Sequence, residues 1–355
     1  MATAGIFVFH LWTDIPLGAD DSLWRPVLER IPLLGAIGVI LFNCMAGFVL
    51  SLPYLGQAQP RPLLSRLIFF RQRFGRIAPH YYLALLLWTI LWLLVSTQDH
   101  SWLAVTVAVL THLGFVHTLH ISTFFSIVPA FWWLGMLAQF YIVYPWLWRL
   151  FVRCGSGRAC LLVCLISWAG WLWLTSLAVQ FPDSLSTVHY LSYFNLPVRL
   201  PEFAIGMWLA SAWNRGARLL HGVPRTTAAS AGRGGIVPTL LVGLLFVLLL
   251  ERSLIRQLPH PLEHIYLVAW CAGSLIAMLR CPLARHLGNR TWMLDIAAAS
   301  YGIYLLHQPL IGYANLWLTD VVPPPSRFLV LLVGLGFLCY KAAQGLNLLV
   351  ARLWR

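Results

Sequence analysis

Residues 33–54 read LLGAIGVILFNCMAGFVLSLPY and contain no charged side chain. As an α-helix this stretch would be about 33 Å long, enough to cross the roughly 30 Å hydrocarbon core of a bilayer. Hydrocarbon offers a backbone no hydrogen-bond partner, so a spanning segment must satisfy its own polar groups, as a helix does. The sequence therefore predicts a transmembrane helix here.

The remainder of the chain has the same character. Of its 355 residues 60% are hydrophobic and 10% are charged, whereas a soluble protein has about 25% charged residues. Its 18 Trp, 19 Phe and 12 Tyr suit the aromatic belts of a helical membrane protein. The ten-residue alternating segments of an outer-membrane barrel are missing. We therefore predict an all-α, polytopic integral membrane helical bundle that forms a single membrane-embedded domain over residues 1–355.

Ten apolar stretches are candidates for spans. They lie near residues 1–14, 33–54, 77–96, 129–150, 159–180, 198–213, 234–250, 262–279, 295–316 and 327–350. An eleventh, 101–118, is ambiguous because it contains His112 and His117 and runs into a polar segment. Between the spans, residues 214–235 are predicted to be a cytoplasmic connector, and His264 is predicted to lie in an interfacial loop.

The basic residues decide how 101–118 is interpreted. The formal charge of +13 comes from arginines placed between apolar runs and not along one face, which favours topology signals over nucleic-acid binding. If 101–118 does not fully cross, seventeen arginines fall on one side of the membrane and six on the other. This bias predicts that both termini are cytoplasmic and that 101–118 is re-entrant or shallow on the outer side.

Ionisable side chains inside a span are costly, by about 2.5–3.5 kcal/mol, so each is a candidate for function. The candidates are His10, Glu202, Asp295, His307 and Lys341. His10 has the most useful chemistry, since a neutral imidazole can accept a proton near neutral pH. The alternative is a histidine that only hydrogen-bonds a neighbouring helix. The candidate span that contains His10, residues 1–14, is short, and we expect this first helix to be truncated at the N-terminus.

Two further pairs each leave two interpretations open. Arg73 and Arg76 are three residues apart on one helix face, which suits binding of phosphates, but they could equally anchor the helix among lipid headgroups. Arg199 and Glu202 have the same spacing and could pair, either for function or as a structural ion pair, and Gly206 allows close helix approach.

No metal site is predicted. His112, His117 and His120 have no carboxylate or cysteine at ligand spacing. The seven cysteines form no CxxC pair, and those in apolar runs are expected to pack in the core.

Several segments together resemble the acyltransferase 3 family of integral-membrane O-acyltransferases. The similar segments are, in chain order, FVFH ending at His10, GVILFNCMAGFVLSL (38–52), FFRQRFGRIAPHYYL (69–83), FWWLGMLAQFYIVYP (131–145), RLPEFAIGMWLA (199–210) and SYGIYLLHQPLI (300–311). Any one of them alone would be weak, but their order along nearly the whole chain makes the resemblance specific.

The chain also departs from the family pattern at several positions. Ala46 and Trp133 stand where the family carries serine, and Leu137 and Ala138 stand where acidic residues are usual. The family's arginine eleven positions before the histidine would fall before residue 1.

The resemblance implies a reaction and a set of roles. The donor is acyl-CoA, commonly acetyl-CoA, used as a co-substrate with no permanently bound cofactor, and the acceptor is a glycan or lipid-linked sugar at a bacterial inner membrane. Arg73 and Arg76 would hold the donor's phosphates, and His10 would act as general base or transient nucleophile. The acceptor side would be shaped by Trp132, Tyr141, Arg199, Glu202 and His307.

Two other functional classes remain to be weighed against this one. A catalytically inactive relative could transport or scaffold surface-glycan precursors, and the lost acidic positions favour it. A secondary transporter would show inverted repeats, which the sequence does not.

Overall fold

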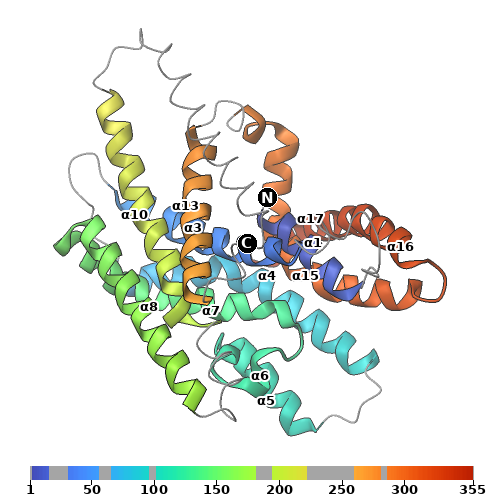
Figure 1. The fold of residues 1–355 in the computed structure, drawn as a ribbon. Coiled ribbons are helices and arrows are strands. Elements are labelled where there is room, and N and C mark those ends of the chain that lie inside the picture. Colours follow the sequence, from blue (N-terminus) through green and yellow to red (C-terminus); the bar gives the residue numbers. More distant parts are fainter. Residues whose placement is uncertain are drawn as a thin grey trace, which may run out of the picture. The chain divides into compact units, whose positions relative to one another are not determined.

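The computed structural model describes residues 2–15, 31–55, 65–95, 101–180, 194–221, 260–280 and 286–354. Within these ranges the chain is built from helices and contains no strand (Figure 1). The predicted all-α class is therefore confirmed for the part of the chain that is described.

The principal helices follow the apolar stretches of the sequence. In chain order they are α1 (Ala2–Asp14), α3 (Ile31–Ser51), α4 (Arg66–Val95), α5 (Trp102–Leu113), α6 (Ile121–Phe124), α7 (Trp132–Cys154), α8 (Ser156–Gln180), α10 (Leu196–His221), α13 (His260–Arg280), α15 (Thr291–Leu318), α16 (Pro324–Val330) and α17 (Gly336–Leu353). A π-helical turn, Leu331–Leu335, joins α16 to α17.

Five helical stretches among the described residues are long and apolar enough to cross a membrane. They are Ile31–Tyr54, Arg66–Val95, Ser156–Leu177, Leu262–Leu279 and Ser326–Leu353. The expected number of about ten spans is thus not confirmed, and the stretch 234–250 lies outside the described residues.

Two segments that were not predicted to be full spans, 101–118 and 214–235, can be compared with the structure. In 101–118, α5 has only twelve residues and is about 18 Å long, which is short of the hydrocarbon thickness. Its placement as re-entrant stays a prediction. The predicted connector 214–235 is wrong at its start, because α10 continues unbroken to His221.

The contacts of the chain divide it into two compact units. The first comprises Met1–Gly38, Leu67–Gln139 and Leu294–Arg355, and the second comprises Val39–Arg66 and Phe140–Met293. His10 and His307 therefore belong to the first unit, and Arg199 and Glu202 to the second.

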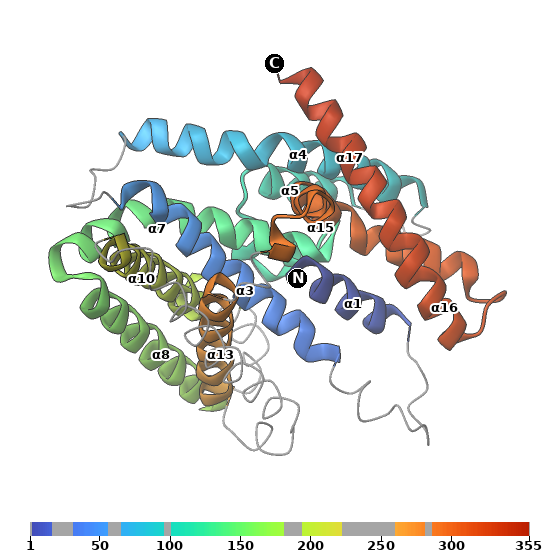
Figure 2. The ribbon, with the colours of Figure 1, turned by 90° about the horizontal axis from the view of Figure 1, so that it is seen from above.

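In the first unit, α1 packs against the C-terminal helices. Phe7 and Leu11 of α1 join Leu331, Leu335 and Cys339 in one buried apolar cluster, and Figure 2 shows α1 beside the α16–α17 stretch. This cluster anchors the first helix by its apolar face, which places His10 against the core of the unit.

In the second unit, α8 and α10 lie side by side, with α13 next to them (Figure 1). Helices α3 and α10 also approach each other closely. A Cβ on Gly206 would overlap the carbonyl oxygen of Cys44, and a Cβ on Gly47 would overlap the carbonyl oxygen of Phe203. Each helix thus uses a glycine to let the backbone of the other come near, as close helix packing in membranes requires. The role predicted for Gly206 is confirmed.

We expect Gly206→Ala and Gly47→Ala to lower the thermal stability of the purified protein. The added methyl group forces two backbones apart, and overpacking of this kind costs about 1–3 kcal/mol. Gly170→Ala in α8 is the matched control, since a Cβ there meets no atom within 4 Å and alanine is the better helix former. Thermal unfolding in detergent gives the comparison. Equal melting temperatures for Gly206→Ala and Gly170→Ala would contradict the close approach.

Candidate active site

His10 lies in the last turns of α1 and is half-buried. Its imidazole lies next to that of His307 on α15, with 5.1 Å between the ring centroids. Phe9 packs edge-on against His10 at 5.0 Å, and Phe7 lies 6.3 Å from His307. Two predicted site residues almost 300 positions apart are thus brought together in a largely apolar setting.

The tautomer of His307 follows from its hydrogen bonds. Its Nδ1 donates to the carbonyl oxygen of Tyr304 at 2.8 Å, so Nε2 of the neutral ring carries the lone pair. That Nε2 atom is buried and has no hydrogen-bond partner among the described residues. The imidazole beside His10 therefore has an acceptor nitrogen, Nε2 of His307, that has no hydrogen-bond partner among the described residues.

The turn before α7 holds the segment around His307 in place. The Tyr304 hydroxyl donates to the carbonyl oxygen of Ala130, and the Ala130 amide donates to Oε1 of Gln308 at 2.6 Å. Trp133 packs edge-on against Tyr304 at 5.5 Å. Trp133, where the resemblance led us to expect serine, thus helps to fix the helix that carries His307.

Four residues of α7 that the resemblance singled out are half-buried or buried. Trp132 begins α7 and is half-buried, as is Tyr141. Leu137 and Ala138 are buried and apolar. At the positions where acidic residues were expected, the helix therefore contributes to the core and supplies no charge.

Arg73 and Arg76 lie near the start of α4. The guanidinium of Arg73 sits 5.7 Å from the ring of Phe69, and its buried Nε has no partner within the described residues. Arg76 is exposed. The two are three positions apart on the helix, which puts both on one face, as predicted.

A buried polar network in the second unit is built around Glu202. Arg199 Nη1 donates to its Oε1 at 2.8 Å, which confirms the predicted pair. Asn43 Nδ2 donates to its Oε2 at 2.6 Å, and His264 Nε2 donates to its Oε1 at 2.6 Å. The carboxylate is fully buried and accepts three hydrogen bonds from the chain itself.

His264 was expected in an interfacial loop, and this prediction is wrong. It lies within α13 and is buried. Trp168 Nε1 donates to its Nδ1 at 3.4 Å, so the proton sits on Nε2 and the ring is neutral. The network then holds one positive and one negative charge, Arg199 and Glu202, which is the condition under which buried ions are tolerated.

The contribution of Asn43 and His264 could not be seen from sequence spacing. Asn43 lies 159 residues from Glu202 and His264 lies 62 residues from it. The only sequence signal was that both are polar side chains within apolar stretches. The saturated carboxylate favours the structural interpretation of the Arg199–Glu202 pair.

His112 and His117 form a separate buried pair. Their rings stack at 3.9 Å, His112 Nδ1 donates to the carbonyl oxygen of Ala108, and His117 Nε2 donates to that of Phe131. Burial and the neighbouring His112 lower the pKa of His117 to about 3, so it stays neutral at physiological pH. The described residues contain no group of three metal-ligating side chains.

Comparison with known proteins gives one match. The model of a family described as "Acyltransferase domain" matches residues 1–341. No curated protein and no solved structure matches the chain.

Removing one charge of the Glu202 network should destabilise the protein more than removing both the Glu202 and the Arg199 charges. We expect Glu202→Gln to destabilise the protein by about 3–5 kcal/mol, because it leaves the buried Arg199 charge unpaired. Adding Arg199→Gln should recover part of that loss. Thermal unfolding of the two single variants and the double variant forms the cycle, with the exposed Asp320→Asn as control. Strictly additive effects would show that the two charges do not interact.

Proposed function

The chain belongs to the acyltransferase 3 family, and from this premise we propose that it is a multi-pass membrane O-acyltransferase of the bacterial inner membrane, with both termini cytoplasmic. The proposed donor is acyl-CoA, with acetyl-CoA the first choice. The proposed acceptor is a hydroxyl of a surface glycan or of its lipid-linked precursor. The observation that carries the proposal is the contact between His10 and His307, with an acceptor nitrogen of His307 left without a partner.

In the proposed reaction His10 acts as general base. A sugar hydroxyl has a pKa far above 7, so its oxygen becomes a good nucleophile only as its proton leaves. A ring nitrogen of His10 takes that proton while the oxygen attacks the thioester carbonyl. The C–S bond then breaks, the acyl group stays on the sugar oxygen, and the CoA thiolate leaves with the proton returned from His10.

We assign His307 the role of positioning residue for His10. A protonated imidazole is expensive in apolar surroundings unless a hydrogen-bond acceptor meets it. His307 Nε2 is such an acceptor, and its orientation is set by the bond from Nδ1 to Tyr304. This arrangement would support the charge on His10 although Leu137 and Ala138 provide no carboxylate.

For the donor we propose Arg73 and Arg76. Two guanidinium groups on one helix face can each form paired hydrogen bonds with phosphate oxygens. Arg73 has a donor nitrogen without a partner in the described part of the chain, and Arg76 is exposed. Both are therefore free to bind an anionic group that approaches the start of α4.

One observation favours a second candidate function. The positions where the family's acidic residues are expected are buried and apolar in α7. A relative that has lost activity and that scaffolds or transports glycan precursors would tolerate this change. The two candidates differ in whether the histidine pair is needed.

Catalysis can be tested with protein reconstituted in lipid, labelled acetyl-CoA and a glycan fraction from the native membrane. We expect His10→Ala to lower turnover by about 10²- to 10⁴-fold, the usual contribution of a general base. His307→Phe should lower kcat with little change in the KM for acetyl-CoA, and His307→Gln, which keeps an acceptor atom, should restore part of it. The exposed His286→Ala serves as control.

The same variants separate enzyme from scaffold. In cells that lack the gene, a scaffold would restore the surface polysaccharide equally well with or without His10. Full complementation by His10→Ala, together with no labelled transfer by the native chain, would reject the enzyme and favour the scaffold.

A separate prediction concerns the donor site. Arg73→Gln and Arg76→Gln should each raise the KM for acetyl-CoA about 10- to 100-fold, since a charged hydrogen bond is worth about 1.5–3 kcal/mol. The KM for the acceptor should change little. Arg71→Gln, an exposed arginine on another face of α4, is the control. If all three variants behave alike, the arginines anchor the helix and do not bind the donor.

A further inference from the structure

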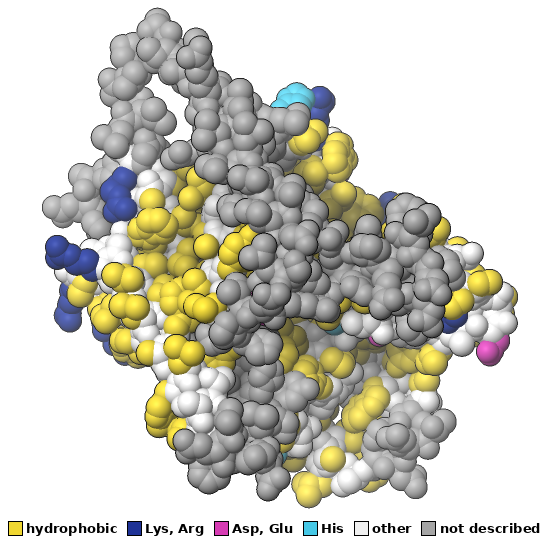
Figure 3. Space-filling view, in the orientation of Figure 1, with side chains coloured by type: hydrophobic (Ala, Val, Ile, Leu, Met, Phe, Trp, Pro, Cys, Tyr) yellow, Lys and Arg dark blue, Asp and Glu magenta, His cyan; other side chains and the backbone are white. Residues whose placement is uncertain are grey.

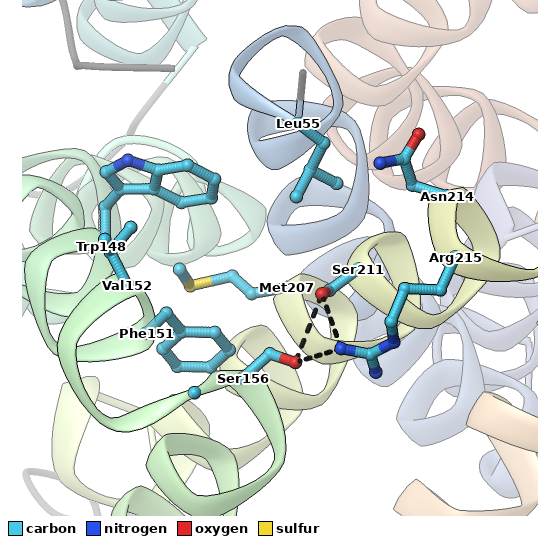
Figure 4. Close-up of a pocket in the computed structure, with 10 residues that line it drawn as sticks. Leu55, Trp148, Phe151, Val152, Ser156, Met207, Ser211, Asn214 and Arg215 are labelled. Carbon is cyan, nitrogen blue, oxygen red and sulfur yellow. Dashed lines mark hydrogen bonds between the residues drawn. The ribbon is translucent and has the colours of Figure 1, made fainter. Parts of the chain in front are cut away.

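A cavity of about 210 Å³ opens in the second unit, where α7 ends, α8 begins and α10 passes by (Figure 4). One wall is apolar and includes Trp148, Phe151 and Met207. The other is polar, and Figure 4 shows the guanidinium of Arg215 turned toward the hydroxyls of Ser156 and Ser211. The cavity is therefore amphipathic, with its donors grouped on one side.

Among the described residues, Arg215 hydrogen-bonds to neutral hydroxyl groups. Arg215 Nη1 donates to Ser156 Oγ at 3.0 Å and to Ser211 Oγ at 3.3 Å, and the two hydroxyls are 3.1 Å apart. No carboxylate among the described residues pairs with Arg215. A guanidinium has five donor hydrogens and each hydroxyl can turn its own, so the cluster can offer several donors to an anion.

The surroundings of the cavity are basic. Arg149, Arg153 and Arg158 are exposed near the same turn, and residues 140–180 contain no acidic side chain. Figure 3 shows basic side chains, in dark blue, gathered at the edge of the molecule where α7 meets α8. Glu202 of α10 is already held by Arg199, Asn43 and His264, so it does not compensate this charge.

The cavity lies at one end of a candidate membrane span. The candidate span of α8 begins at Ser156 itself, and Leu161, Leu165 and Ile166 further along the helix are exposed and apolar. In a bilayer such side chains face the lipid tails, and the first turn of the span lies where phosphates of the headgroups are found.

We propose that this cavity binds the phosphate of an anionic glycerophospholipid, with the acyl chains extending from it into the surrounding bilayer. Arg215, Ser156 and Ser211 would donate to the phosphate oxygens, and the apolar wall would contact the glycerol and the first methylenes. The volume is below the roughly 300–1,000 Å³ of sites that enclose a whole ligand, so it suits one end of a longer molecule. This lipid site goes beyond the acyltransferase function proposed above.

The test compares lipids bound to the intact protein by native mass spectrometry. Native protein is titrated in detergent with phosphatidylglycerol, phosphatidylcholine, glycerol 3-phosphate and acetyl-CoA. We expect phosphatidylglycerol to bind at least about tenfold more tightly than phosphatidylcholine, and Arg215→Gln to remove that preference, since one charged hydrogen-bonding group is lost. Arg158→Gln removes the same charge from the same turn outside the cavity and should keep the preference.

A second variant guards against misfolding and against a general charge effect. Ser211→Val keeps every charge but removes one hydroxyl from the cavity, and it should weaken phosphatidylglycerol binding while the protein elutes as the native chain does. Equal losses in Arg215→Gln and Arg158→Gln would overturn the proposal, because only surface charge would then matter. It would also fail if acetyl-CoA displaced the lipid, or if glycerol 3-phosphate bound as tightly as phosphatidylglycerol.

Discussion

Hydrocarbon supplies no hydrogen-bond partners, so each polar group of a membrane-embedded chain must find a partner within the protein or remain costly. Glu202 shows this constraint most completely. Its carboxylate is buried and accepts three hydrogen bonds, from Arg199, Asn43 and His264. The ion pair alone would leave one oxygen unmet, and the neutral asparagine and histidine complete the set without adding charge. Helices α3, α10 and α13 are thereby joined through one side chain.

The glycines make that network possible. Asn43 and Gly47 are four residues apart on α3, as Glu202 and Gly206 are on α10, so each polar residue shares a helix face with a glycine. The glycines let the two backbones approach until a short asparagine side chain reaches the carboxylate. Close packing and polar satisfaction are therefore one feature of this pair of helices, because a side chain at either glycine would separate the hydrogen-bonding partners.

The parts of this arrangement that depend on local spacing could be predicted from sequence. Hydropathy located most helices, and the Arg199–Glu202 pair followed from its three-residue separation. Contacts between distant segments could not be predicted, because they depend on how helices pack, and so His264 was misplaced in a loop. The continuation of α10 beyond residue 213 was also missed, because its arginines and Gly216 lowered the apolar signal while the backbone remained helical.

The histidines of the first unit contrast with the Glu202 network. His307 uses one ring nitrogen to fix its orientation and keeps the other unpartnered beside His10, in a setting where an unused acceptor is expensive. Among the described residues, His112 and His117 also each bond one ring nitrogen to a backbone carbonyl and keep the other buried without a partner, so this pattern alone does not mark a catalytic histidine. In the proposed reaction, His307 accepts a hydrogen bond from His10 only when His10 becomes protonated. Its acceptor nitrogen must therefore have no partner beforehand, because such a partner would have to be displaced in each turnover. What distinguishes His307 from the His112–His117 pair is its neighbour, because the ring beside it belongs to His10, the residue proposed as the general base.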